Sequence, residues 1–296
     1  MGLAMTPGRG RKFAMATSDP YLGVMLAFVQ AGWSPMALYV VPHEGLTASS
    51  RWTIQRAQQL GMEICLGRLD ERALEHLATR GCDLLVVASH DWKVGRWEQW
   101  IPHAINFHPS LLPHDRGPYP QVQAILRGER NWGVSCHKIS EEFDAGDVLL
   151  QRPFDMDADE TLERLNLRIR MAATALASEV AAGFDMLWPQ AQPQPQGSGT
   201  YVRKYSDADR LLDFSATVSD LDRRMRAFGP IECLADLRGM RVRVLGATFW
   251  REAHGLDAGT LVSALDGELI IAVADGYAGI TRWMPLITDP ASHIVS

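Results

Sequence analysis

Short apolar runs alternate with amphipathic segments through the N-terminal part of the chain. The apolar runs predict buried strands, and the segments between them carry apolar residues at the spacing of one helix face. The predicted strands are residues 13–16, 36–41, 62–66 and 82–88, and the predicted helices are residues 21–31, 50–60 and 71–80. Strands that alternate with helices favour a parallel sheet wound by right-handed crossovers. The chain therefore predicts an α/β fold with an open, mostly parallel, Rossmann-like sheet.

A change of composition near residue 189 divides the chain. Residues 189–198 read PQAQPQPQGS, a proline- and glutamine-rich segment that cannot form a core element. Beyond it, one helical pattern is followed by short β-like runs, and two Asp-Gly turns at 266 and 275 are hairpin signals. The predicted organisation is a disordered end at 1–12, a first domain at 13–188, a linker at 189–200 and a small C-terminal β-barrel-like domain at 201–296.

Between residues 105 and 151, two strand-like runs carry polar side chains to the end of the sheet where ligands bind. Asn106 and His108 are two residues apart, so in a strand they project from the same face. Asp144 lies with Gly146 in an acidic loop after the second run. An amide, an imidazole and a carboxylate can polarise a carbonyl group, carry a proton and orient the proton carrier. No serine or cysteine is placed as an obvious nucleophile, so no covalent enzyme intermediate is needed.

The histidines allow a second interpretation, a zinc hydrolase. Five of them, together with Asp144, provide enough types of metal ligand. They are His90, His103, His108, His114 and His137. None of the usual short ligand motifs of zinc enzymes is present, neither H-E-x-x-H nor a cysteine pair. The sequence therefore favours a site without a metal.

The stretch from 105 to 151 resembles the folate-dependent formyltransferase superfamily. This superfamily includes glycinamide ribonucleotide transformylase, methionyl-tRNA formyltransferase, and sugar and siderophore N-formyltransferases. The shared pattern is Asn-x-His, Ser-Leu-Leu-Pro, Arg-Gly, and Asp-x-Gly after a Gly-Val-Ser strand. The matching residues are Asn106, His108, Ser110–Pro113, Arg116, Gly117, Gly133–Ser135, Asp144 and Gly146. The resemblance covers about residues 13–188 as the catalytic domain and, more weakly, 201–283 as the second domain of the methionyl-tRNA enzyme.

The resemblance implies transfer of a formyl group from 10-formyltetrahydrofolate to an amine through a tetrahedral intermediate. Its implied catalytic residues are Asn106, His108 and Asp144, and the carboxylate is expected to favour a cationic imidazole. The implied folate pocket lies between two loops, beside the Ser-Leu-Leu-Pro turn. Its residues are Ser89, His90, Asp91, Trp92, Ser110, Leu111, Leu112, Pro113, Glu141, Glu142 and Phe143. The candidates for acceptor binding are Arg116, Ser135 and His137.

Composition and charge limit the kinds of binding partner that we expect for this chain. The chain is 47% hydrophobic and 22% charged, which is typical of a soluble globular protein, and no apolar run approaches the roughly 20 residues of a membrane span. The four cysteines are widely spaced and the N-terminus lacks a secretory signal, so we expect a cytoplasmic location. The formal net charge of −6 gives no general reason to expect nucleic acid as a partner.

The molecule that accepts the formyl group is predicted from one difference between this chain and the methionyl-tRNA formyltransferases. Methionyl-tRNA formyltransferases carry a long basic insertion after the second strand, whereas the corresponding stretch here, PHEGLTASSR, holds one acidic and one basic residue. We therefore expect a small-molecule amine, such as an amino sugar nucleotide or a hydroxyornithine-type siderophore precursor. Three alternatives are a methionyl-tRNA formyltransferase, a formyltetrahydrofolate hydrolase and a non-catalytic folate-binding protein. The sequence sets no oligomeric state.

Overall fold

The computed structural model describes residues 10–42, 50–90, 92–195, 197, 199–237 and 239–286. The described chain forms two compact units. The first holds the described residues up to Pro120 together with Asn131–Asp155 and Asn166–Val202, and the second holds Gln121–Arg130, Met156–Leu165 and the described residues from Arg203 onward. Most of the predicted disordered end at 1–12 lies outside the described residues. None of the helices in the described ranges has the length and apolar character that crossing a membrane requires.

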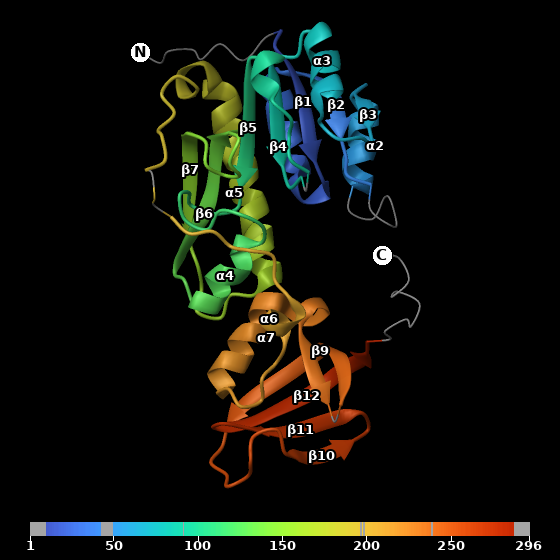
Figure 1. Cartoon of the computed structure of the whole chain (residues 1–296), viewed down its shortest axis with the longest axis vertical. Helices are drawn as coiled ribbons and strands as arrows, with labels where there is room; N and C mark the ends of the chain where they lie inside the picture. Colours follow the sequence, from blue (N-terminus) through green and yellow to red (C-terminus); the bar gives the residue numbers. More distant parts are fainter. Residues whose placement is uncertain are drawn as a thin grey trace. The chain divides into compact units, whose positions relative to one another are not determined.

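The first unit is built on a seven-stranded sheet with the strand order β3-β2-β1-β4-β5-β6-β7 (Figure 1). In chain order the strands are β1 Lys12–Thr17, β2 Ser34–Tyr39, β3 Glu63–Cys65, β4 Leu84–Ala88, β5 His103–His108, β6 Asn131–Lys138 and β7 Val148–Asp155. The first five strands pair in parallel, and β6 and β7 pair antiparallel. This confirms the predicted α/β class. The strand order reverses between β1 and β4, and ligands of such sheets bind near this reversal, beyond the carboxyl ends of the strands.

The helices that connect or follow these strands are α1 Leu22–Gln30, α2 Arg51–Gln59, α3 Glu71–Thr79, α4 Pro120–Arg127 and α5 Leu162–Leu187. Strand β4 is buried along its whole length, which explains its continuous apolar sequence. The C-terminal part of α5 packs on the sheet unit: the Trp33 indole donates to the Ala181 carbonyl over 3.0 Å, and the Phe184 ring meets the rings of Trp33 and His103. The apolar face of this part of α5 is thus buried against the first unit.

From Arg203 onward, the described part of the second unit forms the helices α6 and α7 and a five-stranded antiparallel sheet of order β10-β11-β12-β9-β8 (Figure 1). Its elements are α6 Asp207–Arg210, α7 Val218–Glu232, β8 Leu234–Leu237, β9 Met240–Arg251, β10 Leu261–Leu265, β11 Glu268–Val273 and β12 Gly276–Pro285. Helix α7 begins at the Thr217 cap, whose side chain accepts from the Asp220 amide. The turn at Asp266 and Gly267 has positive φ at both positions, 52° and 83°, as an Asp-Gly hairpin turn requires.

Helices α4 and α6 and strands β7 and β8 were not predicted from the sequence, and a local reason is clear for three of them. Helix α4 begins at Pro120, two residues after another proline, so its start resembles a turn. Strand β7 contains Pro153, which a sheet tolerates because β7 is an edge strand with one unpaired side. Strand β8 has only four residues and follows α7 directly. Short or proline-containing segments carry too little periodicity to be recognised alone.

Candidate active site

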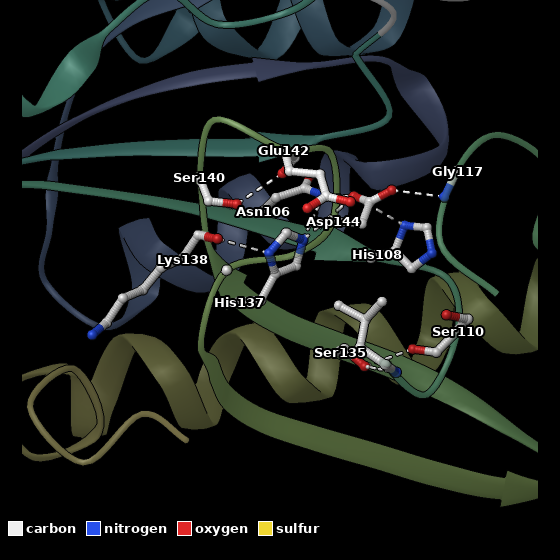
Figure 2. Close-up of polar contacts among 12 residues, drawn as sticks. Asn106, His108, Ser110, Gly117, Ser135, His137, Lys138, Ser140, Glu142 and Asp144 are labelled. Carbon is white, nitrogen blue, oxygen red and sulfur yellow. Dashed lines mark hydrogen bonds and ion pairs between the residues drawn. The ribbon is translucent and has the colours of Figure 1, made fainter. Parts of the chain in front are cut away.

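Two paired strands bring the polar side chains of the site together. Strand β5 carries Asn106 and His108, and its antiparallel neighbour β6 places His137 opposite Asn106 and Ser135 opposite His108. The spacing of two residues predicted that Asn106 and His108 share a face, and Figure 2 shows both side chains on the side from which Asp144 approaches. His108, Ser135 and His137 are all buried. The site therefore lies at the carboxyl end of β5, beside the reversal of strand order.

Asp144 stands in the loop between β6 and β7, with φ of 55°. Its Oδ1 atom lies 3.5 Å from His108 Nδ1 and 3.5 Å from His137 Nε2. The same oxygen accepts from the Asn106 amide at 3.3 Å, and Oδ2 accepts from the Gly117 amide at 2.9 Å. The loop is held close to β6, because a Cβ atom on Gly146 would lie 2.0 Å from the Lys138 carbonyl oxygen. Asn106 and His108, the other two residues of the sequence motif, thus lie beside the Asp144 carboxylate (Figure 2).

Backbone carbonyls define which ring nitrogen of each histidine carries a proton. His108 Nε2 lies 2.8 Å from the Asp115 carbonyl oxygen, so this nitrogen donates. His137 Nδ1 lies 2.8 Å from the Lys138 carbonyl oxygen and donates there. Its Nε2 atom then accepts from the Asn106 amide at 3.1 Å. Both amide hydrogens of Asn106 are engaged, so donation to a substrate oxygen replaces one of these bonds.

Burial dominates the electrostatics of His108. It lowers the pKa of the imidazole, and Asp144 and the Asp115 carbonyl, which act in the opposite direction, offset this only in part. Burial alone would raise the pKa of Asp144, but the neighbouring imidazoles of His108 and His137 and the Gly117 amide hold it well below its ordinary value. Asp144 favours the cationic form of His108, as expected, but burial outweighs its effect. At neutral pH the site holds a neutral imidazole beside an ionised carboxylate.

The two loops expected to hold folate present aromatic and backbone groups. In the first loop Ser89 is exposed with φ of 56°, and the rings of His90 and Trp92 meet edge to face at 5.9 Å. Asp91 lies outside the described residues. In the second loop Phe143 is 53% exposed, and Lys93 Nζ lies 5.9 Å from the centroid of its ring. The neighbouring Glu141 and Glu142 are also exposed. The exposed ring of Phe143 is suited to stacking on a flat heterocycle, whereas His90 and Trp92 are half-buried.

The Ser-Leu-Leu-Pro turn is bound to β6 and β7 by a buried network. The Ser135 hydroxyl donates to the Ser110 carbonyl at 2.6 Å and accepts from the Leu112 amide at 3.0 Å. The Gln151 amide donates to the Leu112 carbonyl and to the Ser135 hydroxyl, each at 2.8 Å. Ser110 itself donates to the His114 carbonyl at 2.7 Å. Of the other turn residues, Leu112 is buried while Leu111 and Pro113 are half-buried. The Ser135 side chain therefore contacts the turn that was expected to hold folate.

Of the remaining acceptor candidates, His137 belongs to the Asp144 cluster and Arg116 lies beside it. The Arg116 side chain is 16% exposed, and its Nη1 atom is 3.8 Å from the Glu142 carboxylate. This long contact leaves the guanidinium weakly paired with that carboxylate. Within the described ranges, no three histidine, cysteine or acidic side chains are grouped so that they could hold a metal ion.

Several contributors to the site were missed by sequence reasoning because they act through the backbone. They are the carbonyls of Asp115 and Lys138, which set the histidine tautomers, and the Gly117 amide, which donates to Asp144. A peptide group has the same chemistry at every residue, so residue types give no signal for it. Only the Arg-Gly position in the motif pointed to this part of the chain.

Two family models match the chain. Residues 68–181 match the model described as formyl transferase, and residues 204–285 match that described as formyl transferase, C-terminal domain. Among sequence relatives, the methionyl-tRNA formyltransferase of Halorhodospira halophila is 30% identical, over 88% of this chain and 86% of that protein.

Solved structures share the fold. An N-formyltransferase from Helicobacter canadensis, in complex with folinic acid and dTDP-3-aminofucose, has a TM-score of 0.66 at 15% identity, over 93% of this chain and 99% of that one. HypX from Aquifex aeolicus, in complex with tetrahydrofolic acid, has a TM-score of 0.61 at 21% identity, over 92% of this chain. The match spans 44% of the HypX chain. At sequence identities this low, the two similarities show a shared fold only.

Proposed function

The chain belongs to the formyl transferase family, and we propose on that basis that it transfers a formyl group from 10-formyltetrahydrofolate to an amine of a small molecule. The observation that carries this proposal is the convergence of Asn106, His108 and Asp144 at the carboxyl end of β5. An amide donor, a neutral imidazole and an ionised carboxylate are the groups that acyl transfer between two nitrogen atoms uses.

The residues beside this cluster fit the proposed donor, which supplies the formyl group. The loop that contains Ser89 and Trp92 and the loop that contains Phe143 hold aromatic side chains that can contact a flat pteridine ring. Two structural neighbours were solved with tetrahydrofolic acid or folinic acid, which supports a folate as the ligand of this fold. We assign the pterin to these two loops and to the turn formed by Ser110–Pro113.

In the proposed mechanism, the nitrogen atom of a neutral amine attacks the formyl carbon, and the bond from that carbon to the folate nitrogen breaks. The Asn106 amide turns one hydrogen toward the formyl oxygen and stabilises its developing negative charge. His108 is neutral, so it accepts the proton that the amine loses and returns a proton to the leaving nitrogen. Asp144 remains ionised and stabilises the imidazolium that forms in between.

This assignment predicts how the rate depends on pH. Because the lowered pKa of His108 lies below the ordinary value of about 6.5, kcat/KM should stay level above that pH and fall toward acid as the imidazole is protonated. Asp144 should cause no further change of rate near neutral pH, because its pKa is lowered and the carboxylate stays ionised there. The profile should be measured with two acceptor amines of different basicity, so that a limb common to both belongs to the enzyme. A common loss of activity as the pH rises through neutrality would mean that the cationic imidazole is the active form.

Charge in the second unit supports a small acceptor. Several arginines that could have formed a phosphate-binding track are paired with nearby carboxylates. The pairs are Arg223 with Asp220, Arg226 with Asp222, Arg241 with Asp236 and Arg251 with Asp275. Arg243 is an exception, because its buried Nε atom has no hydrogen-bond partner among the described residues. Arg224 donates to the Asp209 carbonyl. Arg238 and most of the PHEGLTASSR stretch lie outside the described residues. Paired cations offer less charge to a polyanion, so we favour an amino sugar nucleotide or a hydroxyornithine-type siderophore precursor.

A methionyl-tRNA formyltransferase is the second candidate, and one observation favours it. The relative from Halorhodospira halophila carries that name and matches along both units of the chain. A third possibility is hydrolysis of the formyl donor, because a water molecule can attack the same carbon atom beside the same three residues.

The decisive experiment follows tetrahydrofolate release from 10-formyltetrahydrofolate with and without candidate amines. We expect release to depend on an added small amine, with a product heavier by one formyl group in the mass spectrum. Release at the same rate without an amine would identify a hydrolase. Formylation of initiator methionyl-tRNA in preference to every small amine would establish the second candidate.

A further inference from the structure

The proline- and glutamine-rich segment crosses the loops that carry the catalytic groups. We call residues 192–202 the strap; its positions 196 and 198 lie outside the described residues. At its start, the Gln192 backbone pairs with Val148 at the beginning of β7 through two hydrogen bonds of 2.8 Å. The strap belongs to the first compact unit, which extends to Val202. The segment predicted to be a linker therefore has specific partners in the sheet unit.

The first functional loop that the strap contacts is that of Asp144. The side-chain amide of Gln194 donates to the carbonyls of Asp144 and Gly146, each at 2.8 Å. These two carbonyls flank the bend that turns the Asp144 carboxylate toward His108 and His137. One side chain of the strap thus holds both ends of the bend.

The second loop is that of Asp115, whose carbonyl accepts from His108. The Thr200 hydroxyl accepts from the Asp115 amide at 2.9 Å and donates to the Asp115 carboxylate at 3.0 Å. Asp115 is buried and has φ of 57°, a conformation that costs energy in a residue with a side chain. The reciprocal bonds from Thr200 stabilise Asp115 in this conformation.

The two backbones also pair directly. The Arg116 amide donates to the Thr200 carbonyl at 2.9 Å, and the Val202 amide donates to the Arg116 carbonyl at 2.7 Å. Two glycines permit this approach: a Cβ atom on Gly117 would lie 2.4 Å from the Val202 carbonyl oxygen, and one on Gly199 would lie 2.0 Å from the Pro113 carbonyl oxygen. Both have positive φ, so a side chain there would add strain to the clash.

We propose that the strap is a positioning element of the catalytic site, in which Thr200 acts through the Asp115 carbonyl on His108 and Gln194 acts through the Asp144 loop. The inference rests on the proposed function and deepens it. The Asp115 carbonyl fixes the Nε2–H tautomer of His108, which leaves Nδ1 as the proton acceptor on the Asp144 side. The Gly117 amide, in the same strap-bound loop, donates to Asp144. Loosening the strap should therefore change the state of the imidazole more than the affinity for substrates.

The test uses the full chain with Thr200→Val, which keeps the shape of the side chain and removes its hydroxyl, and Thr200→Ser, which restores the hydroxyl. Gln194→Met removes the amide hydrogens at the other loop. The control is Thr53→Val: the Thr53 hydroxyl donates to the Asp19 carboxylate at 2.8 Å, at the start of α2. Thr53 is buried whereas Thr200 is exposed, so the control removes the more deeply buried of the two threonine–aspartate bonds. This control measures the cost of losing a buried threonine–aspartate bond outside the strap.

We expect Thr200→Val and Gln194→Met to lower kcat by about ten- to a hundredfold, because small displacements of catalytic groups have effects of this size. KM for the folate donor should change less than kcat. Thr200→Ser and Thr53→Val should leave kcat close to that of the wild type, because Thr200→Ser keeps the hydroxyl that bonds Asp115 and Thr53 contacts neither catalytic loop. Wild-type kcat in both Thr200→Val and Gln194→Met would overturn the proposal, as would equal losses in Thr200→Val and Thr53→Val.

A second readout does not depend on activity and so separates this proposal from the proposed function. The His108 ring is titrated by NMR in each variant. The ionisable groups that face it are Asp144, His137 and Asp115. Because the bond to the Asp115 carbonyl raises the pKa of His108, its loosening in Thr200→Val should move the titration of this ring to lower pH, and Thr200→Ser should restore it. An unchanged His108 titration in Thr200→Val would refute the positioning role, even if the wild type formylates no amine tested.

Discussion

Replacement of Asn106, His108 or Asp144 by alanine is expected to slow formyl transfer by at least about a hundredfold each while the protein stays folded. Loss of one preorganised donor at a developing oxyanion typically costs about a hundred- to a thousandfold in rate. Asn106 provides that donor, His108 carries the proton, and Asp144 contacts both side chains. Single-turnover transfer with saturating folate donor is the measurement, because it reports the chemical step and is insensitive to product release.

The three residues act on one reacting group, so their effects should not multiply. The double and triple variants are expected to lose much less than the product of the single losses. His114→Ala is a suitable control, because His114 is an exposed histidine only six positions from His108. Near-native transfer by His108→Ala would eliminate the imidazole as the proton carrier.

Initiator methionyl-tRNA is expected to bind weakly and without specificity at physiological salt, whereas a small amine is formylated under the same conditions. A protein that neutralises six or more phosphates loses roughly a thousandfold or more in affinity as salt rises across the low range. Several arginines in the second unit are paired with carboxylates, and the whole chain has a formal net charge of −6. The measurement is tRNA binding and formylation as a function of salt concentration.

The variant Arg223→Glu provides a control for this prediction. Arg223 is 39% exposed, and its contact with Asp220 is long, 3.9 Å, so it is among the less tightly paired arginines of the second unit. Charge reversal there should leave formylation of a small amine unchanged. Efficient formylation of methionyl-tRNA at sub-micromolar concentration, abolished by this substitution, would contradict the small-molecule assignment.

The amino-acid sequence by itself determined the α/β class, most of the elements and the three residues that meet at the site. Apolar runs bounded by glycines located the parallel strands, because a strand buried on both faces has to be apolar throughout. The spacing of Asn106 and His108 placed both side chains on one face, because residues two apart in a strand point the same way. These properties are local, so the residues themselves carry the signal.

The tertiary structure decided what surrounds those residues and which form they take. The pKa of His108 is lowered because burial outweighs the attraction of Asp144, and the extent of burial is a property of the packed chain. Its tautomer is set by the Asp115 carbonyl, a group that every residue possesses. The strap has the composition of a flexible linker, yet Gln194 and Thr200 find partners in the two catalytic loops 50 and 85 positions earlier in the chain. Hydrogen bonds between segments so far apart form only when the chain is folded, because they depend on distances that no local pattern records.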